Sequence, residues 1–437
     1  MARPDSRRRV FSQIGGCSLG VRVSLLSILA VASAEVLAVA SAEEPTARIE
    51  EIADTTGRWN RVVQAGFGDS EVGLFDPLVK FQGMLFAGGF DENKGCQLLR
   101  SLDGTTWERV IGPGTATPSG FGNPHNESIN ALVVFDDHLY AGTWNEIDGA
   151  ELWRSPDGMT WTLVIGHGVP MAGGFGKQEN SGITALAVFR DQLFAGTGSL
   201  YCKDGVEVWS LHAKSQTWEP IAGERFALQT AFARESKYLL DAEVFNGWLY
   251  FATGDQRTGG SEIWRTQEGR FWEATVGSPS AYRAGMGHVS HDMIFDLASF
   301  KGYLYAAVWD RASEGGALWR SPDGTTWEVV VGDLPARYPM GFGLSGNVGL
   351  VSLAVLGDQL FLGTTNIDHG AQLWASHDGI IWQCLVGPEA PVRSGFGDIE
   401  NSSIFSLLAF RGQLYAGTRN DKGGEIWKLS AGFTATD

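Results

Sequence analysis

Two aspartates, Asp241 and Asp296, stand 55 residues apart near the start of similar apolar segments, and Glu243 adds a third carboxyl group nearby. A carboxyl group in a partly enclosed site has a raised pKa and can act as a general acid, while an ionised partner acts as base or nucleophile. His291 could shuttle protons or bind a metal beside them. Further polar residues precede the two aspartates and could contact a ligand: Arg234, Lys237, Tyr238, His288 and Asp292. A structural interpretation stands beside the catalytic one, in which basic neighbours pair with the aspartates and brace an irregular part of the fold.

The two aspartates interrupt an internal repeat. A phrase of the form Leu-(Tyr/Phe)-x-(Ala/Gly)-(Gly/Thr/Val) recurs seven times with spacings of 54 to 56 residues. A period in this range indicates a stacked or circular array of similar units. We number the repeats one to seven by the leucine that opens each phrase: Leu85, Leu139, Leu193, Leu249, Leu304, Leu360 and Leu414.

Each repeat has the pattern of short β-strands, since apolar residues alternate with polar ones and turn residues separate the runs. In repeat two we predict strands at 129–135, 138–144, 150–155 and 160–165, with a tight turn at Asp136 and Asp137. Four antiparallel strands per repeat are typical of a β-propeller blade. A solenoid of strands is the weaker alternative, because it needs polar capping repeats that the ends of this chain do not supply.

The two ends of the repeat region complement each other. Repeat seven stops after its third predicted strand at 424–429, and GRWNRVVQAGFG from Gly57 matches the fourth-strand sequence TTWERVIGPG from Thr105. We therefore predict an all-β fold, a seven-bladed propeller formed by residues 43–437 as one domain. Residues 58–65 would complete the last blade and remove its open edge.

Tryptophan follows the same repeat, since thirteen of the 16 tryptophans occupy two repeat positions. Because each aromatic side chain buries about 150–250 Å², we expect these residues to pack between blades and not to form a row for sugar stacking. The third-strand position holds Trp153, Trp209, Trp264, Trp319, Trp374 and Trp427. The fourth-strand position holds Trp59, Trp107, Trp161, Trp218, Trp272, Trp327 and Trp382.

Four repeats carry a Ser-x-Asp-Gly-x-x-Trp phrase between the third and fourth strands: from Ser101, Ser155, Ser321 and Ser376. The phrase resembles the Asp-box of sialidases and related glycosidases, usually Ser-x-Asp-x-Gly-x-x-Trp, although here Gly directly follows Asp. The resemblance implies an outer hairpin on the rim of a propeller, away from a catalytic centre. Its turn chemistry explains the phrase without catalysis. No Arg-Ile-Pro occurs, so no sialidase residues are carried over, and LFAGG at Leu85 only loosely resembles Kelch repeats.

Two further repeated features fall on loops that share one face of a propeller. The residue six after each repeat leucine is mostly Asn or Asp, which could supply oxygen ligands to Ca²⁺ or bind a polyhydroxyl ligand, or could simply form local turns. These residues are Asp91, Asn145, Ser199, Asp255, Asp310, Asn366 and Asn420. A Gly-Phe-Gly-x-x-x-Asn phrase ends at Asn126, Asn180, Asn347 and Asn401, where the same two interpretations apply.

Repeats four and five depart from these features together. The Gly-Phe-Gly-x-x-x-Asn phrase becomes AFARESK before repeat four and GMGHVSH before repeat five. Asp241 and Asp296 stand where other repeats have Pro77, Ala or Ser. The two neighbouring repeats thus predict a distinct acidic junction between them.

Residues 1–42 have the pattern of an export signal: Arg7, Arg8 and Arg9 precede an apolar stretch at 23–34, and small residues precede Glu43. RRVF at Arg8 resembles a twin-arginine signal, with ordinary Sec export as the alternative. Removal of this segment, which holds five Arg and two acidic residues, would change the net charge from -17 to -20. Such a surface disfavours nucleic acid and anionic lipid, and three cysteines, an odd number, would remain.

Two functions stay open. The first is a secreted or periplasmic, monomeric propeller that binds a glycan, a cell-surface component or a protein at its channel mouth. The second is a glycoside hydrolase or polysaccharide lyase that uses Asp241, Asp296 and His291. We favour binding, because P-loop, G-x-S-x-G and H-E-x-x-H motifs are missing from the sequence.

Overall fold

A computed structural model describes residues 59–199, 205–223, 232, 236–254, 260–344 and 346–429. The predicted export signal, Cys202, Arg234 and Asp255 lie outside the described residues. The chain divides into two units, 1–54 and 55–437, and all described residues belong to the second. None of the helices in this described part is long and apolar enough to cross a membrane.

The fold is all-β, and every ladder between its strands is antiparallel. Repeat two matches its prediction closely, with strands β6 (Ser128–Phe135), β7 (His138–Trp144), β8 (Leu152–Ser155) and β9 (Thr162–Ile165) paired in sequence order. Asp136 and Asp137 both have positive φ, 49° and 57°, as a two-residue hairpin turn of type I′ requires.

The other repeats form four-stranded sheets in the same way. The remaining first strands are β2 (Leu74–Phe81), β10 (Gly182–Phe189), β14 (Tyr238–Phe245), β18 (His291–Phe300), β22 (Gly349–Leu356) and β26 (Ser403–Phe410). The second strands are β3 (Met84–Phe90), β11 (Gln192–Gly198), β15 (Trp248–Gly254), β19 (Tyr303–Asp310), β23 (Gln359–Thr365) and β27 (Gln413–Arg419). The third strands are β4 (Gln97–Ser101), β12 (Val208–His212), β16 (Ile263–Thr266), β20 (Ala317–Ser321), β24 (Leu373–Ser376) and β28 (Ile426–Leu429). The fourth strands are β5 (Glu108–Ile111), β13 (Trp218–Ala222), β17 (Glu273–Val276), β21 (Glu328–Val331) and β25 (Gln383–Val386).

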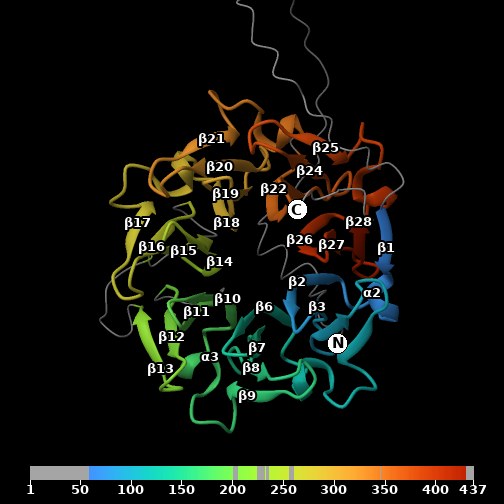
Figure 1. Cartoon of the computed structure of the whole chain (residues 1–437), viewed down its shortest axis with the longest axis vertical. Coiled ribbons are helices and arrows are strands. Elements are labelled where there is room, and N and C mark those ends of the chain that lie inside the picture. The colour runs from blue at the N-terminus through green and yellow to red at the C-terminus, as the bar shows by residue number, and fades with distance from the viewer. Residues whose placement is uncertain are drawn as a thin grey trace, which may run out of the picture. The chain divides into compact units, whose positions relative to one another are not determined.

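The first strands face a common centre (Figure 1). Each contacts the first strands of the repeats before and after it, and β2 contacts both β6 and β26. Sheets that radiate from a shared centre in this way are the arrangement of a β-propeller. The inner strands therefore position any side chain that lies in the middle of the fold.

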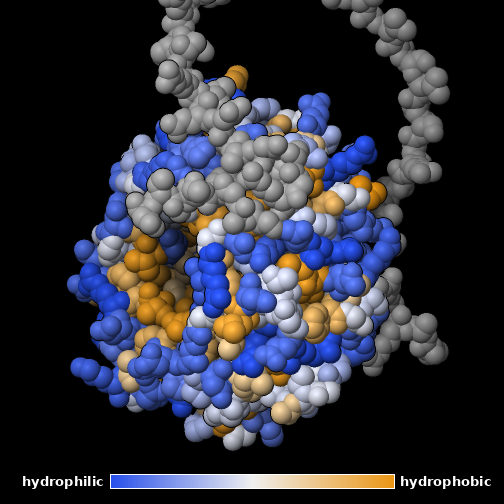
Figure 2. Space-filling model, turned by 45° about the vertical axis from the view of Figure 1, so that its right-hand side comes forward, coloured by the Kyte–Doolittle hydropathy of each residue, from blue (hydrophilic) through white to orange (hydrophobic). Residues whose placement is uncertain are grey.

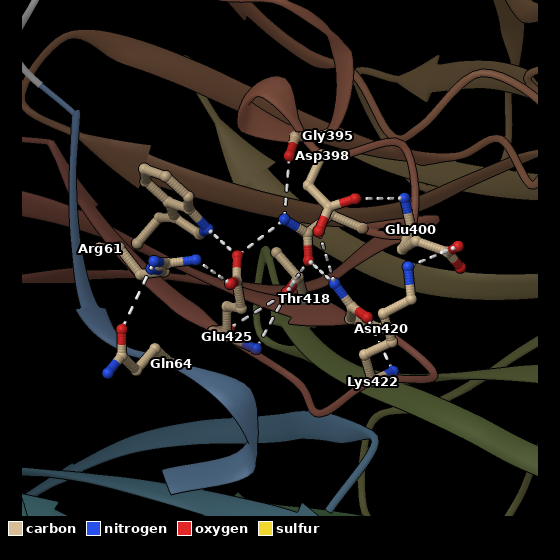
Figure 3. Close-up of polar contacts among 11 residues, drawn as sticks. Arg61, Gln64, Gly395, Asp398, Glu400, Thr418, Asn420, Lys422 and Glu425 are labelled. Atoms are coloured by element: carbon tan, nitrogen blue, oxygen red, sulfur yellow. Dashed lines mark hydrogen bonds and ion pairs between the residues drawn. The ribbon is translucent and has the colours of Figure 1, made fainter. Parts of the chain in front are cut away.

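The sheet of repeat seven receives its fourth strand from the other end of the described chain. Strand β1 (Trp59–Val63) pairs with β28, as the match at Gly57 predicts. Figure 3 shows Arg61 of this strand reaching the buried Glu425, with Nη1 2.5 Å from Oε1. The ring of Trp59 packs 5.0 Å from that of Phe396, so the N-terminal strand takes part in the core of repeat seven.

The Ser-x-Asp-Gly hairpin fastens neighbouring repeats to each other. In repeat five, the backbone N–H groups of Thr325 and Thr326 donate to Asp323 Oδ1 at 2.7 and 2.6 Å. Gly324 has φ +74°, and a Cβ built on it would lie 1.9 Å from the hydroxyl oxygen of Tyr250 in repeat four. Only glycine fits this close approach in a left-handed conformation. The hairpin glycines Gly104, Gly158, Gly269 and Gly379 contact aromatic rings of the preceding repeat in the same manner.

Short helical turns between repeats carry the Gly-Phe-Gly phrase, with Met286 in place of phenylalanine in the turn before repeat five. Phe121 has a left-handed φ of 58°, which is unfavourable for a side chain of its size. Its ring stacks on Trp153 at 4.7 Å and meets Trp161 edge-on at 5.3 Å, so aromatic packing compensates for the backbone. No tryptophan at the two repeat positions is exposed in the described residues, as expected for core residues. These turns are α2 (Ala65–Gly68), η1 (Ser119–Gly122), α3 (Gly173–Gly176), η3 (Ala284–Gly287), η4 (Met340–Gly343) and η5 (Ser394–Gly397).

Candidate functional site

The asparagines of the Gly-Phe-Gly-x-x-x-Asn phrase belong to a buried network. Asn126 is inaccessible to solvent, and its Nδ2 donates to Gly120 O and to Glu151 Oε2 at 2.9 and 2.6 Å. The same Glu151 oxygen accepts the indole N–H of Trp153 at 2.9 Å. Figure 3 shows the corresponding group of repeat seven around Glu425. Asn180, Asn347 and Asn401 make equivalent contacts, so the side-chain amides of all four predicted ligand-binding asparagines are buried and hydrogen-bonded within the fold.

The predicted polar ring of Asn and Asp residues does not form an open ring of ligands. Asn145 is buried; its Oδ1 accepts the N–H groups of Ile147 and Asp148, and its Nδ2 donates to Asn126. In turns of this kind, the side-chain oxygen already accepts backbone N–H groups and is therefore not free to coordinate a cation. Asp91, Asp310, Asn366 and Asn420 are likewise buried and accept backbone N–H groups. Within the described residues, no group of three or more His, Cys, Asp or Glu is arranged to hold a metal ion, and calcium stays a prediction from sequence alone.

The aspartates lie where a β-bulge meets the next repeat. The register of each first strand shifts immediately before this position, for example between Leu239 and Asp241 and between Ile294 and Asp296. A bulge leaves backbone groups unpaired within its own ladder, and buried backbone groups need partners. In repeats five and six, a carboxylate from the preceding repeat supplies one: Asp241 Oδ2 accepts the N–H of Leu297 at 2.7 Å, and Asp296 Oδ2 accepts that of Leu353 at 2.6 Å.

Asp241 and Asp296 also hydrogen-bond to each other. Burial raises the pKa of both carboxyl groups, and the negative charge of Asp241 raises that of Asp296 further. A hydrogen bond between two carboxyl groups requires one shared proton, since like charges in contact do not both ionise. Each side chain keeps part of its surface accessible. The pair is therefore a donor and an acceptor of hydrogen bonds at a partly solvated position.

Two further carboxyl groups accompany this pair. Glu243 Oε1 accepts the N–H of Ser299 at 3.2 Å, and burial raises its pKa. Asp76, on β2, has its pKa raised to about 7 by burial and by the charge of Asp241. Strands β2 and β14 are separated by two repeats, so these charges interact across the centre of the fold. The repeat alignment places Pro77 at this level, and Asp76 lies one position before it, so the sequence pattern does not single out this carboxyl group.

Aromatic side chains lie beside the acidic group. Phe295, next to Asp296 in sequence, packs 5.9 Å from Phe405 and 5.6 Å from Trp309, measured between ring centroids. Because β18 and β26 are separated by β22, the contact between the two phenylalanines also crosses the centre. Figure 2 shows a hollow in one face of the molecule, with hydrophobic residues on its wall and hydrophilic ones at its rim.

His291 is remote from this chemistry. It is 1% exposed, and the charged groups that influence its pKa are His288, Asp310 and Asp333, while burial lowers that pKa to about 4. The described residues give no contact between His291 and the aspartate pair, so the predicted proton shuttle lacks its geometry. The His288 ring lies 4.6 Å from the His291 ring and 3.5 Å from Asp333.

The other predicted ligand residues are mainly structural. Tyr238 is buried and packs 5.9 Å from Trp144. Lys237 holds β15 through its backbone, donating its N–H to Gly254 O at 2.8 Å. Asp292 is buried and lies 3.8 Å from Arg311 Nε. Since Arg234 lies outside the described residues, its predicted pairing with the aspartates stays a prediction.

Comparisons with known proteins give a likeness only at the level of solved structures. No family model matches the chain, and no curated protein matches it significantly. Among solved structures it is similar to Trypanosoma rangeli sialidase in complex with 2,3-difluorosialic acid, a covalent intermediate, with 14% identity and a TM-score of 0.44. The complex of that sialidase with sialic acid gives 14% identity and a TM-score of 0.43. The matches cover 81% and 82% of this chain and 54% of the sialidase, so the chain spans about half its length.

Proposed function

We propose that the chain is an exported, closed seven-bladed propeller that binds a glycan, free or on a cell surface, in its central channel. Closure is supported by the pairing of β1 with β28 and by Trp59 packing on Phe396. It is supported further by the hairpin glycine of repeat one, Gly104, which approaches Tyr415 of repeat seven. The binding group comprises Asp76, Asp241, Glu243 and Asp296.

One observation carries the binding proposal: two side chains that break the repeat, Asp241 and Asp296, meet as a close pair of carboxyl groups whose pKa values burial raises. An ionised carboxyl group only accepts hydrogen bonds, whereas a protonated one also donates. The Asp241 and Asp296 pair therefore suits hydroxyl groups, each of which both donates and accepts. The neighbouring aromatic rings of Phe295 and Phe405 give the apolar contact that the faces of a sugar ring need.

A glycan array compares the wild type with an Asp241→Asn, Asp296→Asn double variant. Asparagine keeps the shape and still donates and accepts hydrogen bonds, but it cannot ionise. The stronger hydrogen bonds that a carboxylate makes to hydroxyl groups are therefore lost, and we expect affinity to fall by about tenfold or more, which corresponds to about 1.4 kcal/mol. Asp191→Asn is the matched control, because Asp191 is an exposed turn residue with φ 58° that asparagine tolerates. Unchanged binding by the double variant, or no glycan bound by the wild type, would contradict the proposal.

The second candidate is a glycoside hydrolase or polysaccharide lyase. It is favoured by Asp76, whose pKa of about 7 suits a general acid near neutral pH, and which interacts with Asp241 across the centre. The Asp241 and Asp296 pair by itself is too close for this role, since glycosidase carboxyl groups stand about 5–10 Å apart. A turnover screen on acidic and neutral polysaccharides, repeated with Asp76→Asn, separates the two candidates. Product formation that is lost in the Asp76→Asn variant would favour the enzyme over the binding protein.

We infer that residues 1–42 direct export, from their basic, apolar and small-residue segments. N-terminal sequencing of the protein recovered outside the cytoplasm should begin at Glu43. An Arg8→Lys, Arg9→Lys variant should stop export if the twin-arginine route is used and leave it unchanged if the Sec route is used. Retention of the full-length chain in the cytoplasm would contradict the inference.

A further inference from the structure

Repeat five lacks one acceptor oxygen that other repeats place in their cores. In repeats two, three, six and seven, a single side-chain oxygen accepts both the Asn amide and the indole N–H of the third-strand tryptophan. That oxygen belongs to Glu151, Glu207, Gln372 and Glu425. In repeat five this position is Ala317, which has no polar side-chain atom.

The two groups that would donate to the missing oxygen remain in place. Trp319 Nε1 is buried without a hydrogen-bond partner, unlike the other described third-strand tryptophans. His291 stands at the asparagine position, and its ring nitrogens are buried. The Gly285 backbone carbonyl interacts with the ring, as the equivalent glycine carbonyls do with the asparagines, which leaves the other ring nitrogen free to donate. Leaving buried polar groups unpaired costs about 1–3 kcal/mol each. Trp319 Nε1 and one His291 ring nitrogen are therefore two buried donors at the place where other repeats hold a shared acceptor oxygen.

The surrounding residues show where the missing group would fit. In repeat four, a Cβ built on Gly277 would lie 2.5 Å from Glu262 Oε1, so the glutamate side chain fills the space beside that glycine. At the equivalent Gly332 of repeat five, only Val329 Cγ2 and Ala317 Cβ lie within 4 Å of the built atom. Met286 also replaces the phenylalanine of the other turns. In repeat five, Ala317 therefore does not fill the space that the Glu262 carboxylate fills in repeat four.

We propose that repeat five binds a small monocarboxylate, such as formate or acetate, between Trp319 Nε1 and the His291 ring. Its carboxylate takes the place that Glu151 and Glu425 occupy in their repeats. Asp310 already contributes one negative charge next to His291, so the bound anion requires His291 to take up a proton. The sequence of repeat four has the same combination of charges. Lys237 corresponds to a protonated His291, Asp255 corresponds to Asp310, and Glu262 stands where the bound anion would lie in repeat five.

Proton uptake sets the pH dependence of binding. The groups that face His291 are His288, Asp310 and Asp333, with Asp292 adjacent in the chain. Burial and His288 disfavour a charged His291, whereas Asp310, the Gly285 backbone carbonyl and Asp333 favour it. Binding should therefore strengthen as pH falls. Because His291 is 1% exposed, entry requires local opening of turn η3, and the protein should be equilibrated with the ligand before measurement.

Thermal unfolding of the whole protein tests the proposal with sodium formate against sodium chloride at equal ionic strength. We expect formate to raise Tm by about 1–3 °C at about pH 5 and less at about pH 8. Calorimetric titration in two buffers of different protonation enthalpy should show about one proton taken up per formate bound. Equal Tm values in formate and chloride would overturn the proposal.

Variants at position 317 make the test specific to this site. Ala317→Glu supplies the missing carboxylate, so its Tm should no longer respond to formate. If this variant does not fold, Ala317→Gln serves instead, because Gln372 shows that an amide oxygen fits the same position in repeat six. An undiminished formate response in the folded variant would place the anion elsewhere and overturn the proposal.

Discussion

The junctions that follow repeats four and five solve the same structural problem as those that follow repeats six and seven, but with the opposite hydrogen-bond polarity. Ser352 Oγ donates to Ile404 O at 2.7 Å, and Ser406 Oγ donates to Phe75 O at 2.9 Å. Asp241 and Asp296, at the same position after the bulge, accept backbone N–H groups instead. One position in the repeat can therefore satisfy either of two backbone groups of the next strand.

At the junction, the structural role of the side chain is therefore separable from its charge. A serine satisfies the bulge while remaining neutral at every ordinary pH. An aspartate also satisfies it, but brings a buried charge that costs free energy unless it is paired or protonated. Two successive aspartates place their carboxyl groups in contact, so the proton they share is a consequence of the repeat geometry and not of a separate motif.

The largest expected effect tests whether repeat seven behaves as an ordinary repeat with β1 as its fourth strand. Trp59→Ala should destabilise the protein by about 3–5 kcal/mol, because it removes a buried aromatic side chain and leaves a cavity beside Phe396. Denaturant unfolding of the whole protein measures the change. Trp107→Ala, at the same position of repeat one, is the matched control, and a loss below about 1 kcal/mol for Trp59→Ala alone would show that β1 is not part of the core.

The aspartate junctions should make stability depend on pH. Asp76 has its pKa raised from 3.8 to about 7, and those of Asp241 and Asp296 are raised as well. The folded state therefore binds more protons than the unfolded state between about pH 4 and pH 7, and the free energy of unfolding should fall as pH rises through this window. Unfolding titrations across the window measure the slope.

Substitution identifies the groups responsible for that slope. Asp76→Asn should flatten it, and Asp241→Ser with Asp296→Ser, which converts both junctions to the serine type, should flatten it further. Asp191→Asn should leave it unchanged. A slope that is the same in all of these variants would show that the central carboxyl groups do not titrate in this range.

The smallest expected effect concerns the serine junctions. Ser352→Ala removes the hydrogen bond to Ile404 O and should cost about 1 kcal/mol. Because no charge is involved, the loss should be the same at about pH 4 and about pH 7, as measured by denaturant unfolding. A loss that changes with pH would mean that the serine junction is coupled to the neighbouring aspartates, and the contrast between the two kinds of junction would fail.

Much of the fold could be read from sequence because the repeat supplies seven copies of the same local physics. Alternating apolar residues, type I′ turns and the Ser-x-Asp-Gly hairpin depend on neighbouring residues, so the strands of repeat two fall within about two residues of their predicted bounds. The odd position of Asp241 and Asp296 was also visible, since other repeats show what belongs there.

The partners of those residues were decided only by the tertiary structure. Asp76 joins Asp241 across the centre, although 165 positions separate them in the chain, and no local pattern encodes that approach. Tertiary packing also decided the environment of the buried asparagines, which from sequence could face a ligand or a neighbouring residue. Asn126 donates to Glu151, which also accepts the indole N–H of Trp153, because β8 folds back next to the turn that carries Asn126. The sequence shows which positions are unusual, while packing of the first strands around a common centre decided which of them meet, because that contact depends on residues from repeats far apart in the chain.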